Sequence, residues 1–188
     1  MNGTNATEAY FAPPSSGVLE RASSIRAAVF DVDGVLTDGS VWVPAEGEPG
    51  YTFHIHDGKG LRMLLDAGIE VVWLTARGCG AVQRRSEELG VRHLLQGRSD
   101  KGAAMEAVHK RLGLTAAECA YTGDDLIDLP AFRRAGLAVA VADAHPALTA
   151  RAHWTTRRPG GRGAVREVCE LILAAQGKLA AAIQAHET

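Results

Sequence analysis

The sequence predicts an α/β fold in which a doubly wound, mainly parallel sheet carries helices on both faces. Short apolar runs without polar alternation, typical of strands buried on both faces, recur along the chain. They alternate with segments whose apolar residues recur at helical spacing, as in successive β-α-β units. Polar residues follow directly after several of the apolar runs, at the edge where parallel sheets place their sites. The predicted architecture is therefore Rossmann-like.

Length, composition and charge limit the possible classes of protein. A chain of 188 residues with 46% hydrophobic residues can build one domain with a full core. The net charge of -2 argues against a general nucleic-acid partner, because no basic excess exists to neutralise phosphates. No apolar run is long enough for membrane insertion. The three cysteines, Cys79, Cys119 and Cys169, form no CxxC pair, which indicates reduced thiols and a cytoplasmic location.

Three segments are expected along the chain. Residues 1–17 lack the basic-then-apolar order of a signal peptide, and residues 1–25 are expected to form a flexible N-terminal arm. Residues 26–175 form the core, and residues 176–188 form a C-terminal tail. A hairpin is expected at about 40–55, because two β-prone runs, 40–43 and 51–55, bracket a Pro/Gly-rich turn.

Each predicted element has a local reason. Strands are expected at 28–30, 70–75, 91–95, 119–122, 137–141 and 154–156, where the apolar runs lie. Helices are expected at about 18–27, 61–67, 78–89, 101–112, 129–135, 146–150 and 165–185. Gly68 and Gly90 end the second and third of these helices, and Asp100 caps the start of the fourth.

The first buried strand leads into two aspartates, Asp31 and Asp33, followed at once by Gly34. Residues i and i+2 of a strand share a face, so the two carboxylates either point together or are separated by the end of the strand. Carboxylates this close repel, and a cation or a shared proton must offset the repulsion. Taken alone, the stretch is equally compatible with an ordinary acidic turn.

Further polar residues follow later strands, and their shared placement favours a site. Thr75 ends the second predicted strand, and an acidic cluster follows a later one. The carboxylates in question are Asp31, Asp33, Asp124, Asp125 and Asp128. Such hard oxygen ligands, without neighbouring cysteines, suit Mg²⁺. A carboxylate beside a metal can attack phosphorus, a second can move protons, and Thr75 and Lys101 could hold the transferring group. A lone lysine at a helix start, like Lys101, is more often simply solvated.

The order of these motifs resembles the haloacid dehalogenase superfamily of phosphohydrolases over about residues 26–170. The motifs are Asp31-Val32-Asp33-Gly34-Val35, Thr75, Lys101 and Gly123-Asp124-Asp125-Leu126-Ile127-Asp128. The resemblance implies that Asp31 is the nucleophile and Asp33 the general acid/base. It implies Mg²⁺ bound by the Asp31 side chain, the Asp33 backbone carbonyl and Asp124. It places Asp128 and Asp125 behind these ligands, and Thr75 and Lys101 on the phosphoryl group.

Spacing suggests the capless type of this superfamily. Only 43 residues separate Asp31 from Thr75, too few for a cap domain beside a hairpin and a helix. One capless subfamily is more similar still, through segments such as 57–60, 141–146 and 160–169. Its members hydrolyse 3-deoxy-D-manno-octulosonate 8-phosphate during bacterial lipopolysaccharide synthesis. That resemblance implies a homotetramer in which hairpins close adjacent sites and the C-terminal tail can reach a neighbouring site.

Some positions depart from the subfamily pattern. His56 replaces an arginine, Lys59 a tyrosine, and Ala76 the glycine of Thr-Gly-Arg. Arg77 and Arg162 carry guanidinium groups that match phosphate or carboxylate oxygens in fork geometry. The candidate substrate-binding residues are Gly34, Ala76, Arg77, His56, Lys59 and Arg162, and Arg162 is equally compatible with a loop residue that faces solvent. Because the departures border the expected substrate mouth, a related nine-carbon sugar-acid phosphate stays open as the substrate.

Two alternatives of other classes use similar residues. A phospho-accepting receiver domain also places aspartates, a hydroxyl and a lysine at the strand ends of a parallel sheet. In a receiver, however, the lysine follows the hydroxyl near the end of the chain, whereas Lys101 precedes Asp124 and Asp125. A non-catalytic assembly partner would have no need of the complete set formed by Asp31, Asp33, Lys101 and Asp124.

Overall fold

The protein is built on one six-stranded parallel sheet in the order β3-β2-β1-β4-β5-β6. This computed structural model describes Phe11 and residues 14–186. The strands are β1 Ala27–Phe30, β2 Glu70–Leu74, β3 His93–Leu95, β4 Cys119–Gly123, β5 Leu137–Ala140 and β6 Trp154–Thr155. The predicted doubly wound α/β fold is confirmed.

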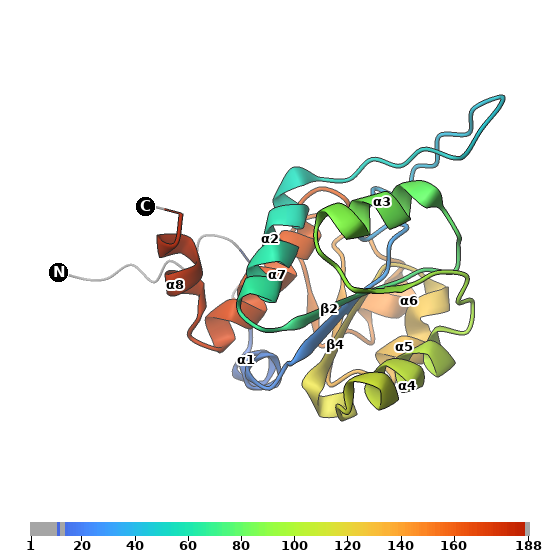
Figure 1. The fold of residues 1–188 in the computed structure, drawn as a ribbon. Helices are drawn as coiled ribbons and strands as arrows, with labels where there is room; N and C mark the ends of the chain where they lie inside the picture. Colours follow the sequence, from blue (N-terminus) through green and yellow to red (C-terminus); the bar gives the residue numbers. More distant parts are fainter. Residues whose placement is uncertain (1–10, 12–13, 187–188) are drawn as a thin grey trace.

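Alternating side chains of the strands pack into two hydrophobic cores, one on either face of the sheet. In β1, Ala28 and Phe30 join one cluster, whereas Ala27 and Val29 join the other. Helices α1 (Ser16–Ser23), α2 (Ile55–Asp66), α3 (Gly80–Glu88) and α7 (Ala164–Ala175) contribute to the first cluster. Helices α4 (Lys101–Leu112), α5 (Leu129–Phe132) and α6 (Pro146–Thr149) cover the second face (Figure 1). Two short 3₁₀ turns, Ala116–Glu118 and Leu126–Asp128, flank β4.

Helix α4 begins and ends where the sequence predicts. The side chain of Asp100 accepts the backbone N–H of Ala103 at 2.9 Å, which satisfies one of the unpaired donors of the first turn. Gly113, with φ of 65°, ends the helix in the left-handed conformation that glycine adopts without strain. These two caps fix the position of Lys101 at the first turn of the helix.

Helix α2 begins at Ile55, six residues earlier than predicted, so His56 and Lys59 are helical. Local propensity does not explain this start, because glycines 58 and 60 disfavour a helix. Tertiary contacts explain the early start of the helix. The buried carboxylate of Asp57 accepts the backbone N–H groups of Gly163 (3.1 Å) and Arg166 (2.8 Å). The first turn of α2 is thereby tied to the N-terminus of α7.

The expected hairpin at 40–55 is far less regular than predicted. Its two segments pair only at Trp42 and Gly50, through hydrogen bonds of 3.2 and 2.8 Å. Figure 1 shows the segment projecting from the body of the molecule. An isolated pair of strands lacks the hydrophobic face that stabilises a sheet. The side chains of Trp42 and Val43 are accordingly 69% and 74% exposed.

The C-terminal region forms two helices rather than the single helix predicted over 165–185. Helix α7 ends at Ala175, and α8 spans Leu179–Gln184. Between them Gly177 has φ of 67°, and the N–H of Lys178 bonds the carbonyl of Leu173 at 2.8 Å. This 6→1 bond is typical of a glycine-terminated helix, which the sequence analysis overlooked.

Part of the predicted N-terminal arm is folded onto the core. Ser15 caps α1, and Val18 and Ala22 of that helix are buried in the cluster that contains α7. The helix expected at about 18–27 is present as α1, and residues 14–25 are folded instead of forming the flexible arm also expected there. The rest of the predicted arm lies mostly outside the described residues. Within the described part of the chain, no helix is both long and apolar enough to cross a membrane.

Candidate active site

The carboxyl ends of β1, β2 and β4 meet at one edge of the sheet, and the predicted site residues gather there. Asp31 follows β1, Thr75 follows β2 and Asp124 follows β4. A cavity of about 220 Å³ opens at this edge. It is lined by Asp31, Asp33, Gly34, Gly39, Ala76, Arg77, Asp124, Asp125 and Ile127. We call it the acidic cavity.

Lys101 lies behind the acidic cavity and is completely buried. Its Nζ is 2.7 Å from Oδ2 of Asp31 and 2.6 Å from Oδ1 of Asp128. Burial alone would lower the pKa of Lys101, but the two carboxylates outweigh it and the pKa lies above its usual value. Lys101 is therefore a buried cation between two carboxylates, not the solvated residue that its position in the sequence also allowed.

The carboxylate of Asp128 accepts four hydrogen bonds. Oδ1 accepts from Nζ of Lys101 and from the hydroxyl of Tyr121, each at 2.6 Å. Oδ2 accepts from the backbone N–H groups of Asp124 (2.9 Å) and Asp125 (3.2 Å). A carboxylate offers about four lone-pair positions, so those of Asp128 are all occupied.

Carboxylate oxygens of Asp31, Asp124 and Asp128 lie within 4.8 Å of one another, a spacing compatible with a shared cation. Because the lone pairs of Asp128 are taken, Asp31 and Asp124 are the carboxylates left to bind one. Asp31 uses one lone pair of Oδ1 for the N–H of Val32 (2.7 Å) and one of Oδ2 for Lys101, and keeps the others. Asp31 and Asp124, two of the three predicted ligands, thus lie close together with lone pairs free.

The electrostatics of the acidic cavity also favour a cation beside Asp31 and Asp124. Burial, followed by repulsion from Asp128, raises the pKa of Asp31 well above its usual value, and Lys101 opposes the rise. Burial and repulsion from Asp128 also raise the pKa of Asp124, to about 7. One lysine thus does not compensate the acidic cluster, and a divalent cation beside Asp31 and Asp124 would favour both ionised forms.

Asp33 lies beyond the end of β1, which settles how the first two aspartates are arranged. Its Oδ2 accepts the hydroxyl of Thr75 at 3.0 Å, and Nε of Arg77 lies 3.6 Å from its Oδ1. The same Thr75 oxygen accepts the backbone N–H of Arg77 at 3.0 Å. Among the described residues, Oδ1 of Asp33 is buried without a hydrogen-bond partner. Thr75 thus holds one oxygen of Asp33, and the other faces the guanidinium of Arg77 without a hydrogen bond from any described residue.

Thr37 organises the loop that follows β1, a role the sequence analysis missed. Its buried hydroxyl donates to the carbonyl of Val32 (3.2 Å) and accepts the N–H groups of Gly34 and Gly39 (both 3.3 Å). A threonine inside a glycine-framed turn was the available signal, because its side chain can replace backbone partners there.

Arg162 approaches the same loop from the far end of the chain. The N–H of Gly161 bonds the carbonyl of Val35 at 2.8 Å, and Nη2 of Arg162 lies 3.2 Å from Oδ2 of Asp38. Arg162 is exposed and is not among the described residues that line the acidic cavity. Asp125 does line it but is exposed, and its Oδ1 accepts the N–H of Leu126 at 2.7 Å.

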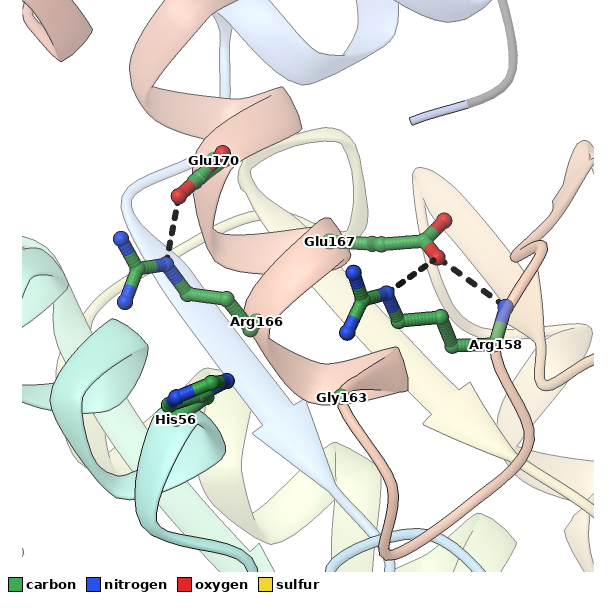
Figure 2. Close-up of a pocket in the computed structure, with 6 residues that line it drawn as sticks. All are labelled: His56, Arg158, Gly163, Arg166, Glu167 and Glu170. Atoms are coloured by element: carbon green, nitrogen blue, oxygen red, sulfur yellow. Dashed lines mark hydrogen bonds and ion pairs between the residues drawn. The ribbon is translucent and has the colours of Figure 1, made fainter. Parts of the chain in front are cut away.

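Two predicted substrate-binding residues lie elsewhere. His56 lines a second cavity of about 250 Å³ between α2 and α7, shown in Figure 2. There Arg166 bonds Glu170, and Glu167 accepts the N–H of Arg158 at 3.0 Å with Nε of that arginine 3.8 Å away. Both glutamates are buried, so each arginine of this cavity has its own carboxylate. Lys59, partly buried on α2, lines neither cavity in the described structure.

Comparison with known proteins identifies the class to which this site belongs. Residues 86–166 match the family of haloacid dehalogenase-like hydrolases. The chain is 45% identical over 179 residues to 3-deoxy-D-manno-octulosonate 8-phosphate phosphatase of Yersinia pestis, covering 95% of this chain and 96% of that one. The chain therefore belongs to the haloacid dehalogenase-like hydrolases. This membership confirms the resemblance found in the motifs and argues against a receiver domain.

Further relatives carry the same phosphatase name. The enzyme of Escherichia coli K12 is 47% identical over 169 residues, which is 90% of each chain. The crystal structure of the Moraxella catarrhalis enzyme, in complex with a magnesium ion, a phosphate ion and a KDO molecule, superposes with a TM-score of 0.88. It is 41% identical and covers 90% of this chain and 97% of that one. Within the hydrolases, the chain thus groups with the 3-deoxy-D-manno-octulosonate 8-phosphate phosphatases.

Proposed function

We propose that the protein hydrolyses a sugar-acid phosphate monoester, 3-deoxy-D-manno-octulosonate 8-phosphate, through a phosphoaspartate formed on Asp31. The observation that carries this proposal is the pair of contacts that Lys101 makes with Asp31 and Asp128. They hold one carboxylate oxygen in place beside an ammonium group that can stabilise a phosphoryl group. The relatives named above are phosphatases of this substrate.

Mg²⁺ is the cation we propose for the acidic cavity. The donors fit, because Asp31 and Asp124 supply hard carboxylate oxygens and the backbone carbonyl of Asp33 lies in the same loop. Burial and repulsion from Asp128 raise the pKa values of both aspartates, and a divalent cation would offset these effects. When bound, Mg²⁺ would neutralise charge on the phosphoryl oxygens and keep Asp31 ionised.

In the first step, a carboxylate oxygen of Asp31 attacks phosphorus, and the bond from phosphorus to the ester oxygen breaks. The leaving alkoxide takes a proton from Asp33, whose Oδ1 has no hydrogen-bond partner among the described residues. Thr75 keeps Asp33 oriented by donating its hydroxyl to Oδ2. Lys101 has three N–H groups, and two of them face Asp31 and Asp128. The third can bond an oxygen of the transferring group.

In the second step, the now ionised Asp33 takes a proton from water, and the water oxygen attacks phosphorus. The bond between phosphorus and Asp31 breaks, which releases inorganic phosphate and restores both carboxyl groups to their starting states. The same residue serves first as acid and then as base, as a double displacement requires.

The sugar would be recognised mainly outside the acidic cavity. A cavity of about 220 Å³ has room for the phosphoryl end and little of an eight-carbon sugar acid. Gly34, Ala76 and Arg77 line it, and we assign them to the phosphoryl end of the substrate. We keep His56, Lys59 and Arg162 as substrate-binding candidates outside the acidic cavity. A nine-carbon sugar-acid phosphate is the alternative substrate.

We propose that the protein is a homotetramer. The observation in support is the projecting hairpin segment 40–55, on which Trp42 and Val43 are 69% and 74% exposed. Large apolar side chains exposed together mark interaction surfaces, and a second copy could bury them. Sedimentation velocity tests this proposal, and the double variant Trp42→Ser/Val43→Ser is expected to sediment as smaller species. A wild-type monomer with full activity would remove the tetramer and any shared site.

The cytoplasm is the location we propose for this activity. Cys79, Cys119 and Cys169 are all unpaired and buried, as in proteins of reducing compartments. Fractionation of cells that express the full chain tests the location, and recovery with periplasmic markers would contradict it.

Phosphate release from a panel of sugar-acid phosphates tests the function. Hydrolysis is expected with Mg²⁺, loss of it with chelator, and preference for the eight-carbon over the nine-carbon substrate. Asp31→Asn should lower kcat by at least about a thousandfold. Asp66→Asn, which alters an exposed surface ion pair, is the matched control and should stay active. Full activity in Asp31→Asn, or hydrolysis that chelator does not affect, would refute the mechanism.

A further inference from the structure

One buried polar group of the site has no role in the chemistry described above, the hydroxyl of Tyr121. Tyr121 lies in β4, where all five residues are buried, and its side chain is wholly inaccessible to solvent. Its ring packs edge-on against Phe132 of α5, with centroids 6.0 Å apart. A buried tyrosine hydroxyl needs a hydrogen-bond partner, and here the partner is Oδ1 of Asp128 at 2.6 Å.

That oxygen is also the acceptor of Lys101, so Tyr121 and Lys101 share one atom. The other oxygen of Asp128 is fixed by two backbone N–H groups of the loop after β4. The carboxylate can therefore neither rotate nor shift without breaking several bonds. Lys101 in turn reaches Asp31 from this fixed point. A continuous set of contacts thus runs from the hydroxyl of Tyr121 to the proposed nucleophile.

We propose that Tyr121 is a positioning residue that keeps Lys101 directed at the phosphoryl group through the shared oxygen of Asp128. The proposal rests on the proposed phosphatase function. Without the hydroxyl, Oδ1 of Asp128 has an unused lone pair in a site closed to water, and the ammonium group can move towards it. Such a movement takes Lys101 away from Asp31 and from the transferring group. Because Tyr121 does not touch the cation ligands, Mg²⁺ binding stays as it was.

Steady-state kinetics of Tyr121→Phe test the proposal. The ring and its packing stay, and only the hydroxyl is lost. We expect kcat to fall about five- to tenfold, while KM and the Mg²⁺ concentration for half-maximal activity change less than about twofold. Phe132→Leu is the matched control, since it removes the ring partner of Tyr121 and leaves every polar contact intact. It should lower the melting temperature at least as much as Tyr121→Phe and leave kcat unchanged.

A second measurement reads the position of Lys101 without any turnover. The chain has four lysines, so a ¹⁵N-detected spectrum of the ammonium groups is simple, and only the buried Lys101 should exchange slowly enough to be seen. Lys101→Arg assigns the signal. In Tyr121→Phe the signal should shift and broaden as the proton exchange accelerates.

Several outcomes would overturn the proposal. They are an unchanged kcat in Tyr121→Phe, an unchanged Lys101 signal, or a loss of kcat in Phe132→Leu as large as that in Tyr121→Phe. The last result would show that activity merely follows core stability. If Tyr121→Phe does not fold, the wild-type hydroxyl proton of Tyr121 decides: rapid exchange with water would contradict the buried bond. A wild type inactive on every phosphate ester would refute the function and leave the spectroscopic comparison intact.

Discussion

Gly34 and Asp124 approach each other so closely that only glycine fits at the first position. A Cβ atom on Gly34 would lie 2.1 Å from Oδ2 of Asp124. Gly34 also has φ of 83°, in the left-handed region that favours glycine. The loop after β1 therefore packs directly against the carboxylate of Asp124, which follows the neighbouring strand β4.

Gly34→Ala should displace Asp124 and weaken Mg²⁺ binding. We expect the Mg²⁺ concentration for half-maximal activity to rise at least about tenfold, because a methyl group and Oδ2 cannot share the space. The matched control is Gly68→Ala, with φ of 79° and no atom within 4 Å of its Cβ position in the described structure. It imposes similar backbone strain, about 1–2 kcal/mol, without touching the site. Equal Mg²⁺ requirements in the two variants would show that the contact is unimportant.

Lys101→Met should strongly destabilise the protein as well as inactivate it. The substitution retains most of the buried chain but leaves Asp31 and Asp128 without their cation. Breaking a buried ion pair in this way costs about 3–5 kcal/mol of unfolding free energy, measured by urea denaturation without Mg²⁺. Lys110→Met, at an exposed position of the same helix, should change stability by less than about 0.5 kcal/mol. A small effect in Lys101→Met would contradict the ion pairs assigned to Lys101 with Asp31 and Asp128.

The affinity for Mg²⁺ should depend on pH because of Asp124. Burial and Asp128 raise its pKa to about 7, so below that pH the carboxyl carries a proton that the cation must displace. The affinity should therefore rise about tenfold per pH unit as pH increases towards 7, and level off above it. Isothermal titration between about pH 5.5 and 8.5 measures this profile. A flat profile across that range would contradict the assignment of Asp124 as a ligand.

Thr75→Val should lower activity without lowering stability much. The hydroxyl that orients Asp33 is replaced by a methyl group of similar size, and we expect kcat to fall about 10- to 100-fold. Thr122→Val provides the control, since the buried hydroxyl of Thr122 has no hydrogen-bond partner among the described residues. That variant should keep its kcat and be equally or more stable, because a buried unpaired hydroxyl is unfavourable. A comparable loss of kcat in both variants would indicate a general effect of altering the strand ends.

The strand ends and the cluster at them could be predicted because both are properties of local pattern. Buried parallel strands read as apolar runs, and the site residues follow them directly, as Asp31, Thr75 and Asp124 do. The boundaries of α4 were predictable for the same reason, since Asp100 and Gly113 act on their own helix. Burial of Lys101 could be inferred only by combining its position with that of the aspartates.

What could not be predicted depends on contacts between distant segments. Helix α2 starts early because Asp57 bonds α7, more than 100 residues away. The position of His56 in a separate cavity follows from that early start. Tyr121 was predicted only as part of an apolar strand. The available signal for its role was a hydroxyl group within a fully buried run. The hairpin segment 40–55 is irregular because no further strand of the described structure packs beside its two halves. Turn-forming residues in the sequence do not reveal that such strands are lacking.

The strand order has a consequence for synthesis of the chain. Strand β1 is made first but lies between β2 and β4, and β4 emerges from the ribosome about 90 residues later. Until then one edge of β1 has no partner, and Lys101 lacks the second of its two carboxylates. A nascent chain that stops before β4 therefore exposes an open apolar strand edge, the kind that pairs with other chains. We expect ribosome pauses within this interval to favour aggregation, and pauses after β4 to be harmless.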